Sequence, residues 1–195
     1  TYSTADTVRP ALQLVKTKKG AHLVSSCFIM CRGDEMLAMG DCAINISYED
    51  TLDKEGNVVL SAADKLAEVG VETAKTAKVF GIEPKVAFLS YSTKGSGKGP
   101  GVDLARTACE KAKEMAPEFA IDGEMQFSKV AGYANTFIFP EIQSGNIGYK
   151  IAQRLGGFDA YGPILQGLNA PINDLSRGCN AEEVYTMAII TAAMA

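Results

Sequence analysis

Residues 85–115 read KVAFLSYSTKGSGKGPGVDLARTACEKAKEM, and this stretch decides the expected fold. The apolar run over Lys85–Ser90 predicts a buried strand, and the pattern over Val102–Met115 predicts a helix. The glycine-rich stretch between them, residues 92–101, is placed as a phosphate-binding loop would be, because glycine lets backbone N–H groups approach an anion. Its spacing fits neither the triphosphate-binding nor the dinucleotide-binding pattern, so a flexible surface loop is an equally good interpretation.

Strand and helix patterns alternate on both sides of this unit. Further strands are predicted in a hairpin over His22–Ile46 with a turn at residues 32–34, and near residues 119–121, 136–139 and 161–165. Further helices are predicted over residues 3–17, 61–80, 144–155 and 181–195. Ser47–Gly56 reads as an acidic loop. Such alternation predicts α/β layers, with sites at the carboxyl ends of the strands.

Two groups of charged residues are expected to face water. Lys65, Glu68, Glu72 and Lys75 lie opposite the apolar stripe of the helix predicted over residues 61–80. Asp122 and Glu124 follow a short strand, in a segment that reads as a turn. His22 is the only histidine of the chain and is expected at the surface, at the edge of a strand.

Composition excludes several classes of function. The chain has 195 residues, a net charge of −4 and a pI of about 5.1, and its Lys and Arg residues are dispersed, so we expect no nucleic-acid partner. The five cysteines include no C-x-x-C pair, which argues against a zinc site or other metal and favours a reducing, cytoplasmic compartment. No apolar run reaches the roughly 18 residues of a membrane helix, and no signal peptide is recognisable, so no membrane association is expected.

The strongest candidate site is residues 173–179, NDLSRGC, just before the last predicted helix. Its Ser176 and Arg177 lie beside a helix amino end, where free N–H groups and positive charge suit a phosphate or a developing oxyanion. Glu183 is spaced from Asn180 as in a capping box, so a purely structural role fits it better on spacing alone. Arg9 opposes the dipole of the first helix, which suits an anion-binding task, although a solvated Arg is the simpler interpretation.

Seven blocks carry a resemblance to a known family. They are STADTVRPALQ (3–13), VAFLSYSTKGS (86–96), DGEMQF (122–127), FIFP (137–140), QSGNIGYK (143–150), GPILQG (162–167) and NDLSRGC (173–179). In this order they resemble the signature blocks of the phosphate acetyltransferases, or phosphotransacetylases, and they cover nearly the whole chain. The match departs from the family in three respects: Glu183 stands where the family form has Asp, a further stretch normally follows Phe127, and the family's amino-terminal portion, with another substrate-binding arginine, is not in this sequence.

The resemblance implies a fold, a reaction and an assembly. The fold is three-layer α/β/α, similar to the isocitrate and isopropylmalate dehydrogenases, with two domains and a cleft between them. Residues 1–20 and 164–195 would belong to a first domain that is incomplete in this chain, and residues 21–163 to a second. The implied reaction is reversible acetyl transfer between acetyl-CoA and phosphate, giving acetyl phosphate and CoA, in a homodimer without cofactor or metal.

Residue roles follow from the same resemblance. Ser176, Arg177 and Glu183 match the family's catalytic residues. The implied substrate-binding residues are Arg9, Lys94 and Asn146. Two alternatives stay open: a phosphate butyryltransferase, and a non-catalytic regulatory domain of phosphotransacetylase type that binds acetyl-CoA.

Overall fold

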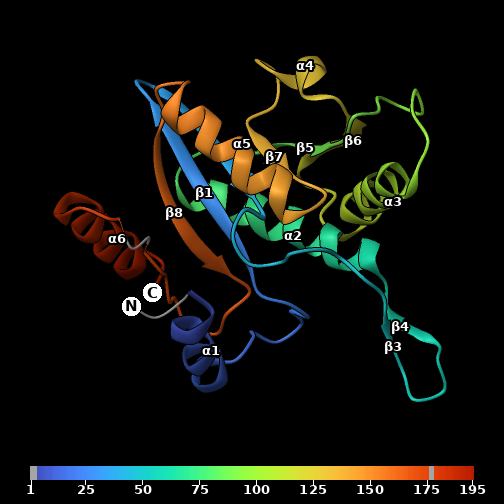
Figure 1. Cartoon of the computed structure of the whole chain (residues 1–195), viewed down its shortest axis with the longest axis horizontal. Coiled ribbons are helices and arrows are strands. Elements are labelled where there is room, and N and C mark those ends of the chain that lie inside the picture. The colour runs from blue at the N-terminus through green and yellow to red at the C-terminus, as the bar shows by residue number, and fades with distance from the viewer. Residues whose placement is uncertain (1–3, 176–177) are drawn as a thin grey trace.

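The computed structural model describes residues 4–175 and 178–195, which form one large mixed sheet with helices on both faces (Figure 1). The strands are β1 (Ser25–Arg32), β2 (Glu35–Gly40), β3 (Thr51–Leu52), β4 (Val58–Leu60), β5 (Lys85–Leu89), β6 (Ala120–Met125), β7 (Thr136–Ile138) and β8 (Asp159–Gln166). The helices are α1 (Thr4–Val15), α2 (Ala62–Val79), α3 (Pro100–Met115), α4 (Phe127–Val130), α5 (Ile142–Arg154) and α6 (Ala181–Ala193).

The six-stranded sheet has the order β6-β5-β7-β2-β1-β8. Strands β6, β5, β7 and β2 run parallel, whereas β1 is antiparallel to both of its neighbours, β2 and β8. The predicted hairpin is therefore confirmed, with Cys31 opposite Met36 next to the turn at Gly33-Asp34. The parallel strands connect through helices, as parallel pairs require. The α/β class is confirmed.

Apolar side chains on both faces of the sheet explain why helices cover both. In β1, Phe28 and Met30 pack on the side of α5, while Cys27 and Ile29 pack on the opposite side. Helices α2 and α3 share that opposite side, where Phe88 of β5 belongs to their core. Residues 25–30 of β1 are consequently all buried, as expected for a central strand whose alternating side chains are covered on both faces of the sheet.

Helix α2 forms where its sequence predicts, and it packs unusually close to the sheet. Ser61 and Asp64 form a reciprocal capping box at its start. At Gly70 the helix meets β5 so closely that a methyl group would lie 2.4 Å from Cζ of Phe88. Glycine is therefore needed at this position for close contact between the helix and the sheet.

Two glutamates of α2 are not on a solvated face, which corrects the expectation from the helical pattern. Glu68 and Glu72 are only 6% and 8% exposed. The segment before β1 covers them: His22 Nδ1 lies 2.9 Å from Glu68 Oε2, and Lys18 pairs with Glu72, which also pairs with Lys75. The pattern within one helix contains no information on this segment, which lies about 50 residues away in the chain. His22 itself is exposed, as expected.

Two further expectations about local structure were wrong. Residues 51–60, part of which was expected to be loop, form the β3–β4 hairpin that projects from the body of the molecule (Figure 1). Asp122 and Glu124 lie within β6 and not in a turn after it. Glu124 is buried, at 1% exposure.

The segment after α1 runs beside the segment after β8. Thr17 and Leu168 form a bridge, Lys18 N–H donates to Gly167 O (2.9 Å) and Asn169 N–H donates to Lys16 O (3.1 Å). The connection from α1 to the sheet and the connection from the sheet to α6 thus run side by side (Figure 1). The division into domains at residues 20 and 164 stays a prediction. Over the described part of the chain, no helix is long and apolar enough to cross a membrane.

Candidate active site

A cleft of about 410 Å³ opens between α5, β8 and the start of α6. Helices α5 and α6 lie on either side of β8 (Figure 1). The lining includes two of the predicted site residues, Asn146 from α5 and Glu183 from α6, together with Asp174, Gly178 and Cys179. The fold therefore brings together residues that are 37 positions apart in the sequence.

Asn173 fixes the start of the NDLSRGC segment beside the cleft. Its Oδ1 accepts a hydrogen bond from Leu165 N–H of β8 (2.9 Å), and its Nδ2 donates to Thr191 Oγ1 of α6 (2.8 Å). One side chain thus ties the segment to the sheet and to the helix. The next residues, Asp174 and Leu175, consequently line the cleft.

Glu183 completes the capping box that its spacing predicts. Glu183 N–H donates to Asn180 Oδ1, and Asn180 N–H donates to Glu183 Oε2, both at 2.9 Å. Among the described residues, no hydrogen bond reaches the other carboxylate oxygen, Oε1. Capping therefore uses one oxygen and leaves the second available to a molecule in the cleft, so the structural and chemical roles are compatible.

Asn146 is oriented by two hydrogen bonds. Its Nδ2 donates to Cys42 O (3.0 Å), and its Oδ1 accepts from Lys150 Nζ (2.7 Å). The contact with Cys42 depends on a close approach of α5, since a Cβ at Gly145 would lie 2.4 Å from the backbone oxygen of Asp41. The glycine at position 145 thus permits the placement of Asn146.

The turn after β2, against which α5 rests, is organised by a buried carboxylate. Asp41 accepts hydrogen bonds from three successive backbone N–H groups, those of Ala43 (3.1 Å), Ile44 (3.2 Å) and Asn45 (2.9 Å). The side chain of Ser26 donates to it as well. A carboxylate with this many donors holds the backbone rigidly, so the wall of the cleft at Ala43 has a fixed position.

The floor of the cleft is apolar. Phe28 of β1 and Tyr149 of α5 stack with ring centroids 4.0 Å apart and an interplanar angle of 14°. Ala160, Pro163 and Met187 extend this surface. Burial, with a smaller contribution from Cys42, raises the pKa of Tyr149, so its phenol stays neutral at physiological pH.

The remaining predicted site residues are placed as follows. Ser176 and Arg177 lie outside the described residues. Arg9 is exposed on α1, and neither Arg9 nor Lys94 is among the residues that line the cleft. Lys94 forms an ion pair with Asp122 and donates to Gly123 O (3.1 Å). Substrate binding by Arg9 and Lys94 stays a prediction.

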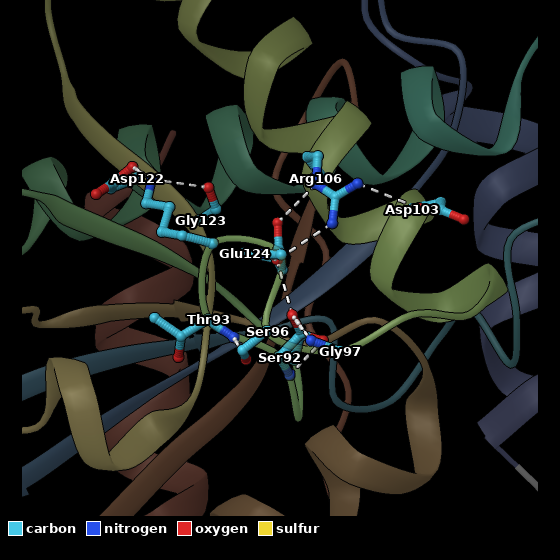
Figure 2. Close-up of polar contacts among 12 residues, drawn as sticks. Ser92, Thr93, Ser96, Gly97, Asp103, Arg106, Asp122, Gly123 and Glu124 are labelled. Atoms are coloured by element: carbon cyan, nitrogen blue, oxygen red, sulfur yellow. Dashed lines mark hydrogen bonds and ion pairs between the residues drawn. The ribbon is translucent and has the colours of Figure 1, made fainter.

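The glycine-rich loop does not present its N–H groups as an open phosphate cradle. Thr93 N–H donates to Ser96 Oγ (2.9 Å), Gly97 N–H to Ser92 Oγ (2.9 Å), and Gly95 N–H to Glu124 Oε1 (2.7 Å). Figure 2 shows the loop closed beneath the carboxylate of Glu124. These three N–H groups are therefore used within the protein, by two hydroxyl oxygens and one carboxylate, and are not free for a phosphate.

Glu124 is the centre of this network, which the sequence did not reveal. Arg106 Nε of α3 donates to Glu124 Oε2 (3.0 Å), and Ser92 Oγ donates to Glu124 Oε1 (2.9 Å). Burial alone would raise the pKa of Glu124, but the hydrogen bonds from Arg106, Gly95 and Ser92 outweigh it and lower the pKa from 4.5 to about 2. Glu124 is thus fully ionised and ties together β6, α3 and the glycine-rich loop.

Two cationic residues of the cleft were not identified from the sequence. Lys150 and Arg154 line it together with Asn146. The sequence spacing could have indicated them: positions 146, 150 and 154 are four apart, and residues four apart lie on one face of a helix.

Comparison with known proteins identifies relatives for the whole chain. The family model described as "Phosphate acetyl/butaryl transferase" matches residues 1–192. Curated proteins named phosphate acetyltransferase are 54% identical in Bacillus subtilis and 51% identical in Staphylococcus aureus. Both alignments include all of this chain, which spans 61% of each relative's length.

Solved structures agree with this result. A phosphotransacetylase from Streptococcus pyogenes has a TM-score of 0.87 and 54% identity over 98% of this chain and 60% of its own. A phosphotransacetylase from Staphylococcus aureus has a TM-score of 0.84 and 50% identity over 99% of this chain and 60% of its own. A branched-chain phosphotransacylase from Enterococcus faecalis shares the fold, at a TM-score of 0.75 and 18% identity. On these grounds the chain belongs to the phosphate acetyl/butaryl transferase family.

Proposed function

We propose that the protein is a phosphate acetyltransferase, which transfers an acetyl group reversibly between acetyl-CoA and phosphate. The observation that carries the proposal is the cleft, in which Asn146 and Glu183 face the same space beside the NDLSRGC segment. Curated relatives at 50–54% identity are named phosphate acetyltransferase, which favours acetyl as the transferred group.

The proposed chemistry assigns a proton acceptor to the cleft. In the direction of thioester formation, the sulfur of CoA attacks the carbonyl carbon of acetyl phosphate. The C–S bond forms, the bond from the carbonyl carbon to the phosphate oxygen breaks, and phosphate leaves with that electron pair. The thiol proton passes to Glu183, whose Oε1 is left available by the capping box. A base is needed because a thiol with a pKa near 8.5 is mostly protonated at neutral pH.

The other roles rest on the family resemblance. Arg177 stabilises the negative charge that grows on the carbonyl and phosphate oxygens, and Ser176 donates a hydrogen bond to one of them. Asn146 contacts substrate from α5, and Arg9 and Lys94 bind substrate from outside the described cleft. No step requires a metal or a prosthetic group, since the acyl donor is already activated, as an acyl phosphate in one direction and as a thioester in the other.

We further propose that the protein works as a cytoplasmic homodimer. The five cysteines are free in the structure, with Cys27, Cys42 and Cys109 buried. Free thiols suit a reducing compartment. Dimer formation would be tested by light scattering on the eluate of a size-exclusion column.

The activity is tested by following thioester formation from CoA and acetyl phosphate, with butyryl phosphate as the competing substrate. We expect kcat/KM to be at least about tenfold higher for acetyl phosphate, because extra methylenes must find room in the cleft. A preference for butyryl phosphate would instead identify a phosphate butyryltransferase. Tight binding of acetyl-CoA without turnover would identify the regulatory alternative and refute the catalytic proposal.

A further inference from the structure

Two positive side chains of the cleft are left without a role by the reaction described above. Lys150 and Arg154 project from the face of α5 that also carries Asn146, and all three line the cleft. Both side chains are exposed to the cleft's solvent, since neither residue is buried. An exposed cation that lines a cavity is available to a ligand.

Neither cation is neutralised by the part of the protein that the structure describes. Within residues 4–175 and 178–195, no carboxylate lies within ion-pairing distance of Lys150 or Arg154. Lys150 Nζ donates to the neutral Oδ1 of Asn146 (2.7 Å) and lies 5.8 Å from the centroid of the Tyr149 ring. Five other lysines, Lys18, Lys75, Lys94, Lys111 and Lys113, pair with Asp or Glu. The positive charge on α5 is therefore uncompensated.

The cleft is also polarised across its width. Its positive wall is α5, while the negative residues, Asp174 and Glu183, belong to the segment that enters α6. The stacked rings of Phe28 and Tyr149 form an apolar floor between these walls. A ligand with phosphate at one end, an uncharged chain and a thiol at the other matches this order of charges.

We infer that Lys150 and Arg154 form a phosphoryl-binding strip on α5, which holds phosphate groups of a substrate while the reacting thiol points to Glu183. This inference rests on the proposed function. The phosphoryl group could come from CoA or from the small substrates phosphate and acetyl phosphate. The charge order favours CoA, because phosphate that is about to react must lie beside the thiol and not on the opposite wall.

The test uses Lys150→Met and Arg154→Met, which remove the charge and keep an unbranched apolar stem. Binding of CoA, dephospho-CoA, pantetheine and inorganic phosphate to the full-length protein would be measured by isothermal titration calorimetry. The matched control is Lys54→Met, since Lys54 is exposed on the β3–β4 hairpin, away from the cleft, and pairs with no carboxylate of a described residue. Lys150→Arg should retain affinity because it retains the charge.

If the bound phosphoryl group belongs to CoA, each Met variant should weaken CoA binding by about tenfold or more, as expected for a lost charge-assisted hydrogen bond. Binding of pantetheine, which carries no phosphate, should be unchanged. An equal loss for CoA and dephospho-CoA would place the diphosphate on the strip, and a loss for CoA alone would place the 3′-phosphate there. Weaker binding of inorganic phosphate, with CoA unchanged, would assign the strip to the small substrates.

Unchanged affinity of both Met variants for CoA and for phosphate would overturn the inference. That result is distinguishable from a failure of the proposed function, because the titrations do not depend on turnover. A protein that turns over acetyl phosphate but ignores both substitutions would keep its function and lose the strip. A protein without turnover whose CoA affinity falls in both variants would keep the strip.

Discussion

Replacing Glu124 with Gln should destabilise the protein by an amount that depends on pH. The carboxylate is 1% exposed and accepts hydrogen bonds from Arg106, Ser92 and Gly95. These lower its pKa from 4.5 to about 2, and each pKa unit corresponds to about 1.4 kcal/mol. The ionised form therefore contributes about 3 kcal/mol to the free energy of unfolding at neutral pH, which the neutral amide cannot supply.

The sign of the pH dependence follows from the direction of the pKa shift. Because the folded-state pKa lies below the unfolded value, the stabilisation is complete above about pH 4.5 and is lost as the pH falls toward about 2. The difference between wild type and Glu124→Gln should thus be about 3 kcal/mol at neutral pH and roughly half of that near pH 3. Asp64, whose pKa is also about 2, titrates in both proteins and cancels from the difference.

Urea denaturation followed by circular dichroism at a series of pH values would measure this difference. Glu118→Gln is the matched control, because Glu118 is exposed and should change the free energy of unfolding by less than about 0.5 kcal/mol. A Glu124→Gln protein whose destabilisation is the same at neutral pH and near pH 3 would refute the reasoning. The loss would then come from packing and not from charge.

Four other substitutions test the site and the fold. Arg177→Gln should lower kcat by about a hundredfold or more at unchanged stability, as for loss of an oxyanion donor, and near-normal turnover would remove Arg177 from the mechanism. Glu183→Gln should keep the capping box and lower kcat by about a hundredfold or more, and a fully active Glu183→Gln protein would leave Glu183 only its structural role. Asn180→Ala removes the cap itself and should lower the free energy of unfolding by about 1 kcal/mol. Gly70→Ala should destabilise by roughly 1–3 kcal/mol in urea denaturation, because its methyl group would meet Phe88 at 2.4 Å, and an unchanged midpoint would show that α2 moves freely.

Local patterns predicted most of the fold because helices and strands are specified by short-range periodicity. The helix predicted from residue 61, the turn at Gly33-Asp34 and the capping box at Asn180 all formed where their residue types indicated. The burial of Glu68 and Glu72 could not be predicted this way, since it depends on Lys18 and His22 from a segment that folds back over α2.

The candidate site was predictable only in part for the same physical reason. The resemblance selected Asn146 and Glu183, and the fold places both in one cleft. Glu124 was misjudged because its partners, Arg106 and the glycine-rich loop, become neighbours only when β5, β6 and α3 are assembled. The role of a charged residue thus depended on tertiary contacts that no local spacing encodes.

The contact between the Glu124 carboxylate and the glycine-rich loop has a consequence for how this protein responds to its surroundings. A loop ordered by a dissolved metabolite is ordered only in the fraction of molecules that carry it, and that fraction varies with concentration. Here the anion is the side chain of Glu124, which every molecule carries, so its presence at the loop does not depend on any cellular concentration. The contact that orders the loop beside β6 therefore needs no dissolved phosphate.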